Sequence, residues 1–80
     1  MLQSIHAIFA DSPVPLYSQL ADLLRQRILR GAWAPGSKVP SLEALVTEFK
    51  VARVTVRQAI EILSREGLLL PQRGRGTFVS

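Results

Sequence analysis

The residues best suited to chemistry lie near the C-terminal end of the sequence and are mostly arginines. Arg53 and Arg57 are one helical turn apart, with Thr55 between them and Gln58 beside them. The guanidinium fork of arginine matches the O6 and N7 acceptors of guanine, and threonine offers a hydroxyl to phosphate and a methyl to thymine. Further along, Arg73-Gly74-Arg75 places two arginines around a glycine whose backbone can approach a phosphate closely. These residue types indicate binding of an anionic partner rather than catalysis.

The distribution of charge supports this interpretation. The 80-residue chain has ten basic and six acidic residues, a formal net charge of +4. Residues 1–49 contain four of each kind, so the whole excess lies in residues 50–80. Taken singly, the helix arginines are better explained as solubilising surface residues, and the glycines near residue 75 as ordinary hairpin glycines. A basic excess confined to one part of a chain favours a nucleic-acid or anionic-membrane surface.

Several classes of function are excluded or disfavoured by composition. The sequence has no cysteine and one histidine, His6, so disulfides, zinc–thiolate sites and two-histidine metal sites are excluded. The acidic residues are scattered and no nucleophile has a base beside it, so we expect neither an enzyme nor a cofactor or metal. No apolar run approaches the roughly 20 residues of a membrane span, and the N-terminus lacks the basic start of a secretion signal. A cytoplasmic protein with no membrane partner is therefore expected.

Three helices must position these side chains. Apolar residues recur at helical spacing in three segments, which predicts helices over residues 16–30, 42–49 and 53–66. Ser41 is a good N-cap for the second helix, and Gly31 suits the position after the first. Residues 1–12 show only a weak helical pattern before a proline-containing break.

The remaining sequence predicts a β-hairpin. Leu68-Leu69-Leu70 and Thr77-Phe78-Val79 have strand composition on either side of a basic turn that contains glycine. Lys38-Val39 can form a further, very short strand. Tyr17 and Trp33 are assigned to the core, together with the apolar faces of the helices.

Only three residues, Lys50 to Ala52, separate the second and third helices. Two short helices joined by such a turn form a helix-turn-helix, whose second helix enters the major groove of DNA with its N-terminal residues leading. The expected fold is therefore mainly α with a small β-hairpin, a winged helix-turn-helix made of a three-helix core and a two-stranded wing.

The same residues, taken in order, resemble a known family. The matching segments are Pro15-Leu16-Tyr17-Ser18-Gln19-Leu20, Arg25 with Ile28, Gly31, Pro35-Gly36-Ser37-Lys38-Val39-Pro40-Ser41, Val51, Arg53, Thr55-Val56-Arg57-Gln58-Ala59, Leu63, Glu66-Gly67-Leu68 and Gly74-Arg75-Gly76-Thr77-Phe78-Val79. The series is similar to the N-terminal winged helix-turn-helix domain of GntR-type bacterial transcription regulators. Its ending is closer to the HutC-type branch than to the FadR-type branch.

The resemblance implies sequence-specific binding of double-stranded DNA and regulation of transcription, with repression as the expected mode. The helix at about 53–66 would lie in the major groove, and the wing at 68–79 would lie at the minor groove and phosphates. The implied DNA contacts come from Ser41, Arg53, Thr55, Arg57, Gln58, Arg73, Gly74 and Arg75. Residues 14–80 would form this domain, after an N-terminal arm at residues 1–13.

Family members carry a C-terminal domain that binds an effector and forms the dimer. Such a domain is absent from these 80 residues, so we expect a homodimer on an inverted-repeat operator only for the full-length protein, and weak dimerisation and weak operator binding for this part alone. Two alternatives stay open. One is a winged-helix protein-interaction module, against which Arg53 and Arg57 argue; the other is a DNA-binding appendage of a fused aminotransferase-like regulator.

Four positions depart from the family's pattern. Leu42 stands where the family usually has glutamate, and Glu43 stands where a basic residue often contacts DNA. We expect no DNA contact at Glu43, because its carboxylate would repel phosphate. Lys50 replaces the common turn glycine, at a cost of about 1 kcal/mol if its φ is positive. Ala52 removes an N-cap worth roughly 1 kcal/mol.

Overall fold

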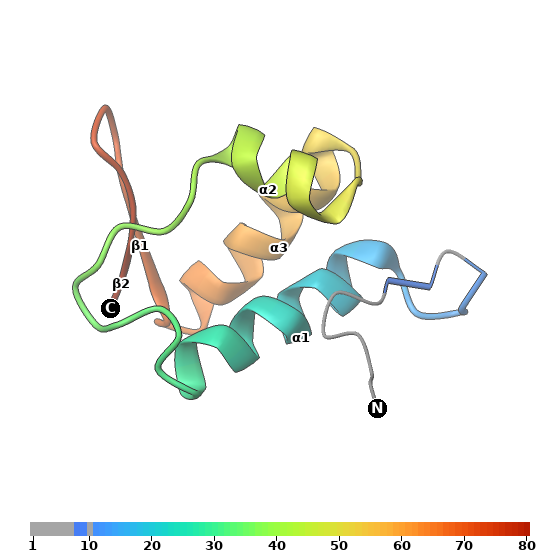
Figure 1. The fold of residues 1–80 in the computed structure, drawn as a ribbon, viewed down its shortest axis with the longest axis horizontal. Helices are drawn as coiled ribbons and strands as arrows, with labels where there is room; N and C mark the ends of the chain where they lie inside the picture. Colours follow the sequence, from blue (N-terminus) through green and yellow to red (C-terminus); the bar gives the residue numbers. More distant parts are fainter. Residues whose placement is uncertain (1–7, 10) are drawn as a thin grey trace.

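The winged helix-turn-helix fold expected from the sequence is present. The computed structural model describes Ile8, Phe9 and residues 11–80. Three helices precede an antiparallel hairpin: α1 (Leu16–Leu29), α2 (Leu42–Phe49), α3 (Arg53–Arg65), β1 (Leu69–Gln72) and β2 (Gly76–Val79) (Figure 1). The weak helical pattern of residues 1–12 falls mostly outside the described residues.

The core forms where α1, α2 and α3 meet the inner face of the hairpin. Its largest fully buried side chains come from four of these elements and are Leu20, Leu24, Leu45, Leu63, Leu69 and Val56. Trp33 is half-buried against this cluster, as expected. Tyr17, however, keeps 36% of its surface exposed, so its assignment to the core is wrong. It lies one turn before Leu20, and helical spacing predicts the direction of a side chain but not how far along the helix the packing partners extend.

The turn between α2 and α3 has the expected chemistry. The Ser41 hydroxyl caps α2 by accepting a hydrogen bond from the Ala44 amide, 3.1 Å away. The helix ends at Lys50, which is left-handed at φ 55°. Ala52 occupies the N-cap of α3 and makes no side-chain capping bond. Two positions in this turn therefore carry local costs that glycine and serine would avoid.

The first strand of the wing is displaced from the expected segment. It runs over Leu69–Gln72 instead of residues 68–70, so it includes Pro71, which faces Thr77 in the register. Proline has no amide hydrogen to donate and is therefore tolerated on an edge strand. In the described part of the chain β1 pairs with β2 alone and is therefore such an edge, while the segment that precedes α2 lies along the other side of β2.

That segment fastens the wing to the helices. The Val39 amide donates to the Thr77 carbonyl and the Val79 amide to the Ser37 carbonyl, both at 2.9 Å. The very short strand expected at Lys38-Val39 is a single antiparallel bridge between Lys38 and Phe78. β2 is thus hydrogen-bonded along both of its edges, to β1 on one side and to this segment on the other.

Phe9 and Val14, which precede α1, are hydrogen-bonded to a side chain of its first turns. The Gln19 Oε1 accepts from the Phe9 amide at 2.8 Å, and its Nε2 donates to the carbonyls of Phe9 and Val14 at 2.9 and 2.8 Å. One amide side chain therefore holds both ends of this short segment.

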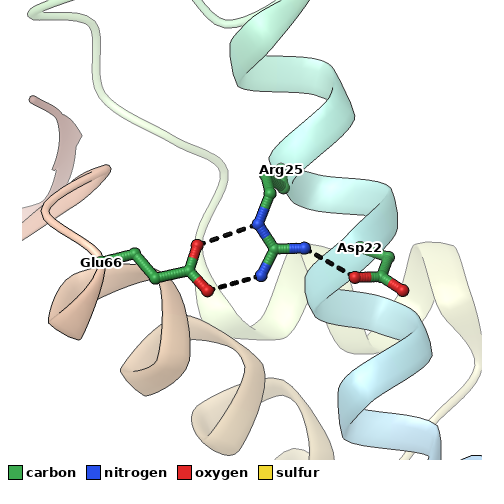
Figure 2. Close-up of polar contacts among 3 residues, drawn as sticks. All are labelled: Asp22, Arg25 and Glu66. Atoms are coloured by element: carbon green, nitrogen blue, oxygen red, sulfur yellow. Dashed lines mark hydrogen bonds and ion pairs between the residues drawn. The ribbon is translucent and has the colours of Figure 1, made fainter.

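A cluster of charged side chains joins the end of α3 to the middle of α1. Figure 2 shows the Arg25 Nε and Nη2 donating to the two carboxylate oxygens of Glu66, at 2.9 and 2.7 Å, while its Nη1 meets Asp22 at 2.6 Å. The hydrogen bond from Arg25 holds the pKa of Glu66 below its ordinary value of 4.5. The Glu66 and Asp22 carboxylates in turn raise the pKa of Arg25.

Candidate nucleic-acid interface

The predicted DNA-binding residues come from three elements on one side of the molecule. The start of α2, the start of α3 and the tip of the wing all lie away from α1, along the upper edge of the view in Figure 1. An arrangement of this kind presents a helix end and a β-turn to the same extended partner.

The first two turns of α3 carry four of the predicted DNA-binding residues, and most of these four are exposed. Arg53, Arg57 and Gln58 are exposed, and Thr55 is half-buried. Arg57 and Gln58 line a groove of about 520 Å³ that continues to Pro71 and Thr77 of the wing. Arg53 forms an ion pair with Glu43 of α2, a contact that sequence analysis did not predict.

The wing tip is exposed and basic. Arg73, Gly74 and Arg75 are all solvent-accessible, and the Arg75 amide closes the turn by donating to the Gln72 carbonyl at 2.9 Å. Gly74 has φ +76°, and a Cβ built there would meet no atom within 4 Å. Glycine at this position therefore serves the turn and leaves its backbone open to a close approach.

Lys38, which the sequence analysis placed only in a possible short strand, also belongs to this surface. It lines a hollow of about 390 Å³ with Ser41, Gly74 and Arg75, between the wing tip and the start of α2. Its side chain crosses the wing at Gly76, where an added Cβ would lie 2.5 Å from the Lys38 Cε. In the sequence, the position of Lys38 three residues before the capping Ser41 could have indicated that it lies on this surface.

Three arginines of this surface differ from most of the others in lacking an ion pair within the described chain, whereas Arg53 is paired with Glu43. Arg25, Arg27 and Arg65 each have a carboxylate partner within the chain. In the part of the chain that the structure describes, Arg57 and Arg75 have no such partner, and neither does Arg73. Cations without internal partners are available to phosphates or base edges.

Two other kinds of site find no support in the described residues. Among Ile8, Phe9 and residues 11–80, no three histidine, cysteine, aspartate or glutamate side chains are grouped so as to hold a metal ion. No helix within the same residues has the length and apolar character needed to cross a membrane.

Residues 16–79 match the family described as "Bacterial regulatory proteins, gntR family". The chain belongs to this family. Its three helices and wing are the winged helix-turn-helix DNA-binding domain of gntR-family regulators, as the sequence predicted.

Two curated relatives illustrate the similarity to gntR-family repressors. The mannosyl-D-glycerate transport/metabolism system repressor MngR of Escherichia coli is 49% identical over 65 residues, which is 81% of this chain and 27% of that protein. The histidine utilization repressor of Pseudomonas putida is 35% identical over 79 residues, 99% of this chain and 32% of that protein. The second relative agrees with the expected similarity to the HutC-type branch. The chain thus spans about a third or less of the length of these relatives.

Two solved structures of gntR-type domains superpose closely. The DNA-binding domain of AraR in complex with operator ORX1 has a TM-score of 0.84 and 33% identity, covering 92% of this chain and 95% of that one. YtrA from Sulfolobus acidocaldarius, a GntR-family transcription factor, has a TM-score of 0.83 and 35% identity, covering 96% and 82%.

Proposed function

We propose that this chain is the sequence-specific DNA-binding part of a gntR-family transcriptional repressor. The observation that carries the proposal is the position of Arg57, which is exposed near the start of α3 without a carboxylate partner among the described residues. It lines the groove that continues to Pro71 and Thr77 of the wing. A helix of this kind inserts its N-terminal residues into the major groove. The repressor names of the curated relatives and the AraR–operator complex support the proposal.

The binding roles divide by element. Arg53, Thr55, Arg57 and Gln58 of α3 face base edges, where a bidentate arginine distinguishes guanine from other bases. The wing and the start of α2 contact the minor groove and phosphates, which fix position without reading sequence; these contacts come from Ser41, Lys38, Arg73, Gly74 and Arg75. The Ser41 hydroxyl already accepts from Ala44, and its hydrogen remains available to a phosphate oxygen.

The organisation of the whole regulator follows from this role. Residues 14–80 form the DNA-binding domain and residues 1–13 an arm that leads into it. The full-length protein is a cytoplasmic homodimer that binds an inverted-repeat operator, because two domains related by a two-fold axis require two half-sites. Its activity is regulatory and not enzymatic.

The test of direct readout is a selection of bound duplexes from a random pool. Wild type is expected to enrich a short motif, and Arg57→Ala to lose about 1–3 kcal/mol of affinity for that motif and relax the preference at one base pair. The matched control is Arg65→Ala, at the far end of the same helix, where Arg65 is 72% exposed and paired with Glu61; it should leave the motif unchanged. Purely salt-sensitive binding without enrichment would contradict the proposal.

The wing makes a different prediction in the same assay. Arg75→Ala should weaken binding to the motif and to random DNA by the same factor, and reduce the slope of log K against log salt by about one. A loss confined to the motif would mean that the wing reads bases, contrary to the proposed division of roles.

A further inference from the structure

The ion pair between Glu43 and Arg53 lies on the face that the proposed function assigns to DNA. Glu43 is in the first turn of α2 and Arg53 is the first residue of α3, so the contact spans the helix-turn-helix at the end presented to the partner. We propose that Glu43 is a positioning residue, which orients the Arg53 guanidinium toward a guanine and thereby sets the base preference of the domain. This inference rests on the proposed function.

The pair has little to contribute to folding. The side chains of Arg53 and Glu43 are 54% and 62% exposed, and ion pairs as exposed as this have small effects on stability. Their consequence is geometric. In the described part of the chain Glu43 is the one residue that pairs with the Arg53 side chain, so the carboxylate across the turn is the contact that limits where this long side chain points.

The contact with Glu43 involves the Nη1 atom and leaves the Nε–Nη2 edge of the Arg53 guanidinium for DNA. Glu43 engages the Nη1 atom, and in the described part of the chain no other residue pairs with Arg53. The Nε and Nη2 atoms form the other edge of the planar guanidinium. Two adjacent N–H donors are what bidentate recognition of guanine O6 and N7 requires. An arginine held through Nη1 therefore has its Nε–Nη2 edge oriented for guanine before DNA binds. An arginine without such a contact also reaches phosphates, which are the same in every sequence.

The charge of Glu43 acts in the same direction. A carboxylate beside the phosphate path disfavours every duplex, through repulsion that does not depend on sequence. Only a duplex with guanine in front of Arg53 recovers the loss through the oriented fork. Repulsion from all sequences combined with attraction to one is a general way to obtain specificity.

The test uses the full 80-residue chain and the neutral variant Glu43→Gln. We expect its preference for the base pair read by Arg53 to fall by about tenfold, while its affinity for random duplex rises. Glu43→Asp, which keeps the charge, should restore part of the preference. In an Arg53→Ala background, Glu43→Gln should not change that base preference further, since the acid acts through the arginine.

Each other outcome is informative. Equal gains on motif and random DNA would show that Glu43 acts only by repulsion, and would overturn the inference. Equal losses on all DNA, with a lower unfolding temperature, would assign it a structural role and overturn the inference as well. If wild type enriches a motif that Glu43→Gln leaves unchanged, only this inference fails, whereas a wild type that enriches nothing removes the proposed function itself.

Discussion

At the scale of single residues, Lys50 shows how a local departure from a pattern becomes a measurable strain. Its φ of 55° places a residue with a Cβ in the left-handed region, which disfavours every residue type except glycine and, to a lesser degree, asparagine and aspartate. The resemblance to the family, which commonly has glycine at this position, gave this cost on the condition that φ is positive, and the structure meets the condition. The same sequence could not predict the partner of Arg53, since that contact depends on the angle at which α2 and α3 meet.

Replacement of Lys50 by glycine should stabilise the domain. Lys50→Gly removes the left-handed penalty, and we expect a gain of about 1 kcal/mol in the free energy of unfolding, measured by urea denaturation. Lys50→Ala is the control, because it removes the charge but keeps the Cβ. If alanine stabilises as much as glycine, the gain comes from charge rather than from backbone conformation.

At the scale of elements, the helices were predictable to within one residue and the first strand was not. The three helices have apolar residues at helical spacing; Ser41 marks the start of α2, and Gly31 and Gly67 follow the ends of α1 and α3. The strand Leu69–Gln72 contains a proline that appeared to end it. Proline is accepted there because β1 lies at the edge of the sheet, next to β2, whose other side pairs with residues 36–39. That pairing is a tertiary contact and has no local signal.

The wing should lose its attachment when its buried anchor is shortened. Leu69 is fully buried and adjacent Leu70 is 47% exposed. Leu69→Ala should cost about 2–5 kcal/mol in the free energy of unfolding, from lost burial and the cavity left behind. Leu70→Ala should change it by less than about 0.5 kcal/mol. Comparable losses in the two variants would place the strand in a different register.

At the scale of the whole molecule, the Arg25–Glu66 contact joins residues 41 positions apart. Sequence analysis assigned neither residue a partner, because the contact exists only once α1 and α3 have packed. The lowered pKa of Glu66 means that its carboxylate is ionised more readily in the folded chain than in the unfolded chain. Its stabilising contribution is therefore present above the ordinary pKa of 4.5 and is lost as pH falls through the lower folded value.

The downward shift of the Glu66 pKa predicts how the stability of the domain depends on pH. Arg25→Met should lower the unfolding temperature at neutral pH, and the difference from wild type should shrink as pH falls below the ordinary glutamate pKa of 4.5 and through the lower folded value. The control is Arg65→Met, which breaks a 3.4 Å pair with Glu61 within one helix, where both side chains are more than 60% exposed. That variant should show little difference at either pH. A wild-type advantage over Arg25→Met that persists undiminished in acid would mean that packing of the arginine stem, and not its charge, joins the two helices.

The strip of backbone between the wing and α2, residues 39–41, also limits where the domain can tolerate inserted or deleted residues. Val39 is hydrogen-bonded to the wing, and two residues later Ser41 caps the helix. This strip therefore fixes the spacing between two elements that we propose contact phosphates. Stacked base pairs repeat every 3.4 Å or so along each strand, and one inserted residue can add a similar distance. An insertion here would move one contact off its phosphate while the other stayed in place. The turn at Gly31–Pro35 is exposed at most of its positions, so we expect natural insertions and deletions to accumulate there.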